Sequence, residues 1–205
     1  MYWLGADVGL YGVMILVRNP KLSYETRATL IRLAFHIDLF PRISFALLLP
    51  VGMHLARDLG LYPFTDGLMI LGWTAGILWS LLHLAVVRYK GTAFAHALIR
   101  FNQFYELLLG GFFVTVGAVS LASGAPIEAG WFAAKLLIFG LIFWVILGID
   151  AVFQPFTTIL RMGPAGSTPE KEREVTRATN ITMAWALLLY VLVLSVAFLG
   201  KVKPF

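Results

Sequence analysis

Histidine, acidic and arginine side chains lie within stretches that are otherwise apolar, and they are the residues of this chain most able to do chemistry. The stretch Leu33–Leu59 carries His36, Asp38, Arg42 and His54. A charged side chain in hydrocarbon costs roughly 2.5–3.5 kcal/mol, so such residues persist where they pair or work. These residues are therefore the first candidates for a functional site.

The composition indicates a chain that crosses a membrane several times. Its 205 residues are 60% hydrophobic and 13% charged, with a mean hydropathy of +0.84, whereas soluble domains hold about 25% charged residues. Apolar runs of about 20 residues match roughly 30 Å of hydrocarbon. They predict an all-α six-helix bundle, a polytopic membrane protein with one integral membrane domain over residues 1–205. The predicted spans are Tyr2–Val17, Leu33–Leu59, Gly67–Val87, Phe101–Ala122, Ala129–Phe153 and Asn180–Leu199.

Basic residues lie between the apolar runs and predict an orientation in the lipid bilayer. The connections after the first, third and fifth spans carry eleven Lys and Arg residues, and the other side carries three. The positive-inside rule places the more basic side in the cytoplasm and both termini outside. The net charge of +5 is therefore interpreted as membrane orientation, and nucleic acid is not an expected partner.

Several kinds of chemistry are excluded by missing residues. The chain has no cysteine, which excludes disulfides, thiolate metal sites, cysteine-ligated iron–sulfur clusters and thioether-bound haem. The HExxH, GxSxG and P-loop motifs are also absent. The remaining polar residues must therefore act through imidazole, carboxylate or guanidinium groups.

His36 and His83 are the sharpest chemical candidates. The predicted orientation puts both in the cytoplasmic half, at similar depth on consecutive spans. Neutral imidazoles on facing helices are the usual axial ligands of a b-type haem within a bundle, so the pair predicts a haem or other metal site. The alternative is that His36 is interfacial and His83 bonds to a neighbouring helix. His54, near the outer face, is a candidate metal ligand or quinone site, or else an interfacial histidine.

Charged residues of the inner half form a second group of candidates. Asp38 and Arg42 are one turn apart, and Asp7 lies at about the depth of Arg42. They predict either a structural ion pair or triad or a clamp on a haem propionate or another anion, for which arginine is suited. Glu106 and Asp150 are candidate catalytic groups that relay protons from the cytoplasm. Their alternative roles are to pair with the basic loops or to cap helix ends.

Local signals predict where helices begin and where they approach one another. Ser23 followed by Thr26 favours a helix start, as do the capping hydroxyl, proline and acid of Thr168–Glu170. Gly72 and Gly76 form a small-residue face suited to close helix contact. These signals predict tight packing on the third span.

Two segments, YWLGADVGLY and DLFPRISFALLLPVGMHLA, resemble small bacterial inner-membrane proteins of the copper-resistance protein D (CopD-like) group, which is related to the HemJ-type protoporphyrinogen oxidases. The resemblance covers roughly residues 1–90. It implies haem, porphyrin or copper chemistry in a bacterial cytoplasmic membrane. Relatives often carry a histidine upstream of the tryptophan–glycine stretch, and this chain begins too late to hold it. This absence either supports a natural start upstream of Met1, which the short first span also favours, or removes the group's most plausible haem ligand.

These features favour a multi-pass inner-membrane protein that binds b-type haem or porphyrin and acts in electron transfer or porphyrin oxidation. His36 and His83 would be the ligands, and Arg42 with Asp38 would hold an anionic group. One alternative is a copper or other small-solute transporter, although the six methionines form no MxxM pair. Another is a structural accessory subunit of a larger membrane complex or a homo-oligomer.

Overall fold

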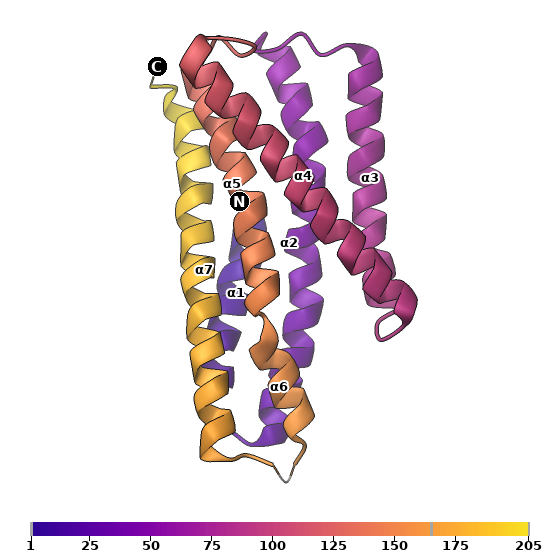
Figure 1. Cartoon of the computed structure of the whole chain (residues 1–205), viewed down its shortest axis with the longest axis vertical. Coiled ribbons are helices and arrows are strands. Elements are labelled where there is room, and N and C mark those ends of the chain that lie inside the picture. Colours follow the sequence, from indigo (N-terminus) through magenta and orange to yellow (C-terminus); the bar gives the residue numbers. More distant parts are fainter. Residues whose placement is uncertain (1, 165, 205) are drawn as a thin grey trace. The chain divides into compact units, whose positions relative to one another are not determined.

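The described part of the chain is built of α-helices and contains no strand. The computed structural model describes residues 2–164 and 166–204, with the side chains of residues 2–4 and 154 outside that description. The predicted all-α fold class is confirmed. The helices are α1 (Tyr2–Val17), α2 (Tyr24–Asp58), α3 (Asp66–Arg88), α4 (Ala93–Ser123), α5 (Gly130–Val152), α6 (Gln154–Met162) and α7 (Pro169–Val202) (Figure 1).

Five helical segments have the length and composition needed to cross a membrane. They are α2, α3, α4, the run Gly130–Met162 through α5 and α6, and α7. Helix α1 is a shorter apolar helix. The chain is thus a multi-pass helical membrane protein, as the apolar runs predicted.

Two predicted helix starts are confirmed by hydrogen bonds at their caps. Ser23 Oγ accepts from the backbone N–H of Thr26 at 3.2 Å, directly before α2. Thr168 Oγ1 accepts from the N–H of Lys171 at 3.4 Å, directly before α7. Each bond satisfies an amide that has no partner within its own helix.

Helix α4 begins earlier than the apolar run predicted, at Ala93 instead of Phe101. Thr92 provides the reason, because its Oγ1 accepts from the N–H of Ala95 at 3.2 Å. The predicted basic connection is therefore partly helical. The cap at Thr92 thus starts the helix within the polar segment, before the apolar run begins.

The predicted fifth span ends at Phe153, and the residues that follow it form a further short helix, α6. Pro155 lies in the first turn of α6, where its missing N–H has no intrahelical partner to lose. Phe156 and Ile159 are buried. Helix α6 is thus a short amphipathic helix that contributes to a core.

The helices form two compact units, each described by itself. The first comprises Met1–Pro41 and Val145–Tyr190: α1, the start of α2, the end of α5, α6 and most of α7. Its apolar core is made by Val13, Met14, Val17, Ile31, Ala34, Phe156, Ile159 and Val175.

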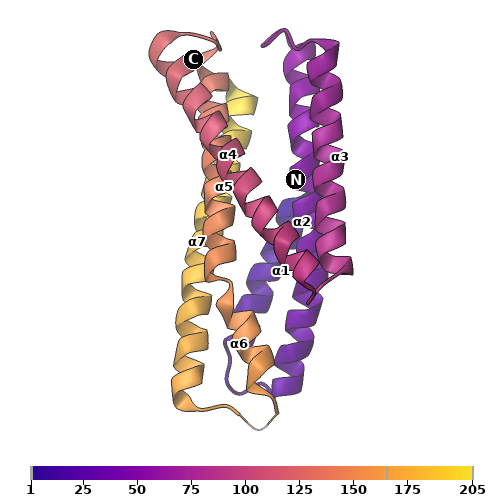
Figure 2. The same cartoon turned by 45° about the vertical axis from the view of Figure 1, so that its right-hand side comes forward.

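The second unit comprises Arg42–Trp144 and Val191–Phe205. Helix α3 lies beside the second part of α2, and α4 runs obliquely from the end of α3 to the start of α5 (Figures 1 and 2). A Cβ on Gly76 would lie 2.9 Å from Cγ of Pro50, and one on Gly72 would lie 2.5 Å from Sδ of Met53. The predicted small-residue contact of α3 is therefore confirmed, and its partner is α2.

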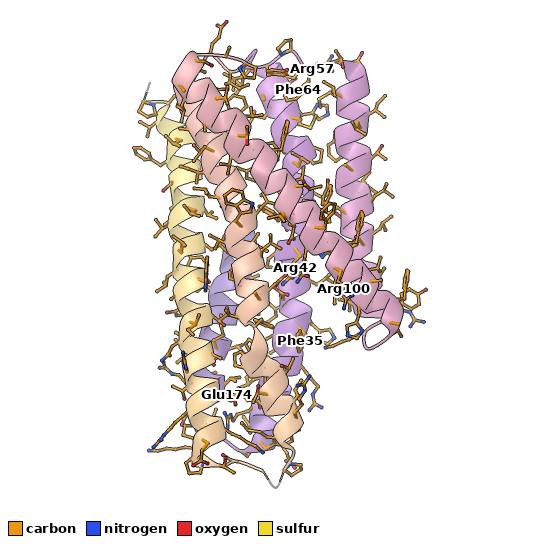
Figure 3. The ribbon with its side chains drawn as sticks, in the orientation of Figure 1. Phe35, Arg42, Arg57, Phe64, Arg100 and Glu174 are labelled. Atoms are coloured by element: carbon orange, nitrogen blue, oxygen red, sulfur yellow. The ribbon has the colours of Figure 1, made fainter. Side chains whose placement is uncertain are left out.

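At the turn between α2 and α3 an exposed ion pair joins the two helix ends. Arg57 Nη1 lies 2.7 Å from Asp66 Oδ1, and Figure 3 shows Arg57 beside Phe64 at this turn. Exposed pairs of this kind contribute about 0–1 kcal/mol. The close packing of glycine against Pro50 is therefore the stronger determinant of how α2 and α3 sit together.

Candidate functional site: a buried polar cluster between α3 and α4

Four polar or polar-tipped side chains are buried where α3 meets α4 in the second unit. Trp79 and His83 come from α3, and Asn102 and Glu106 come from α4. Glu106 is only 2% exposed, and the other three are also buried. These residues are called the α3–α4 polar cluster below. Each pair is four residues apart, so each helix presents its two members on one face.

Hydrogen bonds link three members of the cluster in a chain. Trp79 Nε1 donates to Asn102 Oδ1 at 2.7 Å, and Asn102 Nδ2 donates to Glu106 Oε1 at 3.0 Å. The Asn102 amide thus accepts at one end and donates at the other, which holds its orientation. Asn102 and Glu106 are four residues apart, so they lie one turn apart on the same face of α4.

Aromatic rings surround Trp79 and leave the cluster in apolar surroundings. Its ring stacks on Phe143, with centroids 5.8 Å apart and planes at 11°, and meets Phe45 and Tyr105 edge-on at 5.9 and 5.2 Å. The His83 ring centroid lies 6.0 Å from that of Trp79. Away from water, hydrogen bonds are stronger and an ionised carboxylate is costly. The hydrogen bonds that link Trp79, Asn102 and Glu106 are therefore stronger here than they would be in water.

His36 lies on the exposed side of α2 in the first unit. Its Nδ1 is 2.8 Å from the carbonyl oxygen of Arg32, one turn earlier. A proton on Nδ1 would be donated to that carbonyl, which leaves the lone pair on Nε2. Backbone bonds of this kind commonly orient histidines that ligate metals.

Several of the predicted groups of site residues have members in both units. His36, Asp38 and Asp150 lie in the first unit, whereas Arg42 and Glu106 lie in the second. Arg42 is found on the middle part of α2 (Figure 3). The pairing of His36 with the second unit's His83, the Asp7–Asp38–Arg42 triad and a relay between Glu106 and Asp150 all stay predictions.

His54 is exposed on α2, and its ring centroid lies 5.8 Å from that of Trp73 on α3. Both residues belong to the second unit. Within residues 2–164 and 166–204, no group of three or more His, Asp or Glu side chains gathers to hold a metal ion. A role for His54 as ligand stays a prediction.

A buried ion pair in the first unit was not foreseen from the sequence. Arg27 donates to the two carboxylate oxygens of Glu172 at 2.7 and 3.0 Å, and its Nε donates to the carbonyl of Val17 at 2.9 Å. The hydrogen bonds and charge of Arg27, with a bond from Ser167, outweigh burial and hold the pKa of Glu172 below its usual value. Glu172 precedes the apolar part of α7, so this pair lies outside the membrane-spanning segment. It joins α1, α2 and α7 at one end of the unit.

Three residues of these sites, Trp79, Arg27 and Glu172, were missed by reasoning on the sequence. Trp79 could have been found, because it lies one turn before His83 on the same face of α3. Arg27 carried no such signal, since it lies in a connection rich in charged residues and its partner is 145 positions away. Its role depends on how α7 returns to the first two helices.

Comparisons of the chain with protein-family models, with curated proteins and with solved structures find no match.

Proposed function

We propose that this protein binds b-type haem or porphyrin and acts in membrane redox chemistry, with the α3–α4 polar cluster as its proton-exchanging site. The observation that carries the proposal is the burial of Glu106. Its carboxyl group is 2% exposed on a helix apolar enough to cross a membrane. Acidic residues at such positions typically mark proton relays or ligand sites. The hydrogen bond from Asn102 then stabilises the carboxylate when the proton has left.

Trp79 and Asn102 act as positioning residues in this proposal. The indole N–H holds the Asn102 carbonyl oxygen, so the amide N–H₂ points at the Glu106 carboxyl. A fixed donor next to a carboxyl removes the need for water to reorganise when charge develops there. Glu106 would accept a proton when nearby charge becomes more negative and release it when that charge is withdrawn.

Two imidazoles suffice as axial ligands of a b-type haem, and in this proposal they are those of His36 and His83. His36 has its Nδ1 placed against the Arg32 carbonyl, and His83 is buried among aromatic rings. These two histidines would hold the group, which supplies one-electron redox chemistry when bound. Arg42 and Asp38 would orient its propionates through the arginine fork.

The visible spectrum of protein purified from a haem-replete host tests the proposal. We expect reduction with dithionite to produce the sharp alpha band of a b-type haem. His36→Ala and His83→Ala should each abolish or broaden that band. His96→Ala is the matched control, because His96 is exposed on α4 and is not among the predicted ligands.

The function of Glu106 is tested separately from ligation. In a haem-loaded protein, Glu106→Gln should keep the spectrum and weaken the dependence of the midpoint potential on pH. A protein that takes up no haem under these conditions would contradict the haem proposal. A pH dependence that Glu106→Gln leaves unchanged would contradict the proton role.

A second candidate function is proton-coupled transport of a small solute, including a copper ion. It is favoured by the same buried carboxyl, because Glu106 is 2% exposed on a helix apolar enough to cross a membrane. Flux of candidate solutes into proteoliposomes under a pH gradient would separate the two functions. Transport that Glu106→Gln abolishes, in a protein that takes up no haem, would favour this second candidate.

We also infer that the protein lies in a bacterial cytoplasmic membrane with both termini outside. The support is the distribution of Lys and Arg, eleven on one set of connections and three on the other. The inferred orientation places His36, His83 and Glu106 in the cytoplasmic half. Protons would then reach Glu106 from the cytoplasm.

A further inference from the structure

A groove on the first part of α7 lies outside the α3–α4 polar cluster. It is a shallow, open groove of about 540 Å³, lined by Glu172, Arg173, Thr176, Arg177, Asn180 and Ile181. Arg173 and Arg177 are one turn apart, and Asn180 and Ile181 continue the same face of the helix. The groove is open to the surface and belongs entirely to the first unit.

The groove is rich in donors for an anion. Arg173 and Arg177 are exposed within it, and Arg18 reaches its rim, where Nη1 donates to Asn180 Oδ1 at 2.7 Å. That bond uses the Asn180 carbonyl and leaves its N–H₂ as a further donor. The Thr176 hydroxyl is a neutral donor between the two arginines.

The acidic residue of the groove is already neutralised. Glu172 accepts hydrogen bonds from Arg27 at 2.7 and 3.0 Å and from Ser167 at 2.6 Å. Glu170 and Glu174 are exposed on the same stretch of α7 but do not line the groove, and Figure 3 shows Glu174 there. The charges left to act on a ligand are therefore those of Arg18, Arg173 and Arg177.

The position of the groove along α7 indicates which kind of anion it can bind. From Ile181 to Leu199 the helix rises about 27 Å at 1.5 Å per residue, close to the roughly 30 Å of bilayer hydrocarbon. Arg173 and Arg177 therefore lie at the depth of lipid headgroups, with Ile181 where acyl chains begin. Basic pockets at this depth bind anionic phospholipids.

We propose that the α7 groove binds the headgroup of an anionic phospholipid. The phosphate contacts Arg173 and Arg177, Arg18 supports it from the rim, and the acyl chains run along the apolar surface beyond Ile181. The site is independent of any role of Glu106, because it uses none of the cluster's residues. Its function is to hold one lipid against the end of the first unit.

Native mass spectrometry of the full chain in detergent tests this proposal. Phosphatidylglycerol and phosphatidylcholine with the same acyl chains are titrated in parallel. We expect the wild type to bind phosphatidylglycerol in preference to phosphatidylcholine. The double variant Arg173→Gln/Arg177→Gln should lose about tenfold or more of that affinity, because each basic residue near a lipid surface contributes substantially.

The matched control is Arg88→Gln/Arg100→Gln, which removes the same charge from the second unit. It should keep the preference, and Arg173→Lys/Arg177→Lys should keep most of it. Thr176→Glu provides a second variant in the groove and should also reject the anionic lipid. Equal losses in the groove and control variants would overturn the proposal, as would equal binding of the two lipids.

Inorganic phosphate separates a lipid headgroup from a soluble anion. We expect excess phosphate to leave the bound phosphatidylglycerol in place, because the acyl chains contribute to binding. Displacement of the lipid by phosphate, with phosphate itself retained in the groove, would overturn the lipid assignment.

Discussion

The indole nitrogen of Trp79 donates a hydrogen bond of 2.7 Å to the side-chain oxygen of Asn102, and both residues are buried. Through this bond α3 holds the amide that in turn holds Glu106 on α4. The pair therefore joins two helices and also sets the environment of a buried carboxyl. Its removal should affect both stability and proton exchange.

Trp79→Phe should lower the free energy of unfolding by about 1–3 kcal/mol, because Asn102 loses a buried partner. The matched control is Trp144→Phe. Trp144 is 39% exposed, and its Nε1 bond to the Leu107 carbonyl is longer, at 3.4 Å, so its loss should cost less than half as much. Chemical unfolding in detergent, followed by circular dichroism, measures both; equal losses would contradict the structural role of the Trp79 bond.

Substitutions at Glu106 should separate hydrogen bonding from charge. Glu106→Gln keeps an acceptor for Asn102 Nδ2, so it should destabilise the protein less than Glu106→Leu does. Glu106→Leu removes that acceptor and should cost about 1–3 kcal/mol. Thermal unfolding of both variants in the same detergent provides the comparison, and a larger loss in the Gln variant would refute the assigned bond.

Gly76→Ala should loosen the contact between α2 and α3. The new Cβ would lie 2.9 Å from Cγ of Pro50 and 3.1 Å from the carbonyl oxygen of Ala46, which forces the helices apart at a cost of about 1–3 kcal/mol. Gly111→Ala is the control, because a Cβ there meets nothing within 4 Å and alanine favours helix. We expect the control to be neutral or stabilising; the same loss in both variants would rule out the close contact.

The Arg27–Glu172 pair should make stability depend on pH. Arg27 holds the pKa of Glu172 below its usual value of about 4.5, so the ionised form is favoured more in the folded state than in the unfolded state. The stabilisation is therefore present at neutral pH and is lost as pH falls through the folded-state pKa. Glu172→Gln should destabilise at neutral pH by about 2 kcal/mol, less than for a fully buried pair, because the Glu172 side chain keeps 15% exposure.

Unfolding midpoints measured from neutral to acidic pH test this prediction. The gap between wild type and Glu172→Gln should close as the pH falls, whereas Glu174→Gln, on the exposed side of α7, should track the wild type throughout. A gap that stays constant with pH would show that the ion pair does not account for the difference.

The absence of cysteine allows the orientation to be tested with single introduced thiols. Lys201→Cys should react with a membrane-impermeant maleimide in cells whose outer membrane has been permeabilised. Lys90→Cys should react only after the inner membrane is also permeabilised. Both positions are exposed, so the opposite pattern would reverse the orientation inferred from the basic residues.

The pattern of residues along the chain was enough to predict the all-α membrane fold, two capped helix starts and the glycine face of α3. Each follows from interactions within a few residues: apolar runs must be helical in lipid, and a hydroxyl before a helix must satisfy its first amides. The shared turn of Asn102 and Glu106 was predictable for the same reason. These features can be predicted without knowing which residues of other helices pack against them.

Partners distant in the sequence came only from the folded chain. Trp79 meets Asn102, and Arg27 meets Glu172 145 positions away, because packing chooses how each helix is rotated and which residue it faces. Helix α6 emerged for a related reason, since burial of Phe156 and Ile159 stabilises a nine-residue helix that is too short to be stable alone. The hydropathy pattern predicts how deep a residue lies in the membrane. Which neighbour its side chain faces depends on the rotation of the helix about its axis, and contacts between helices set that rotation.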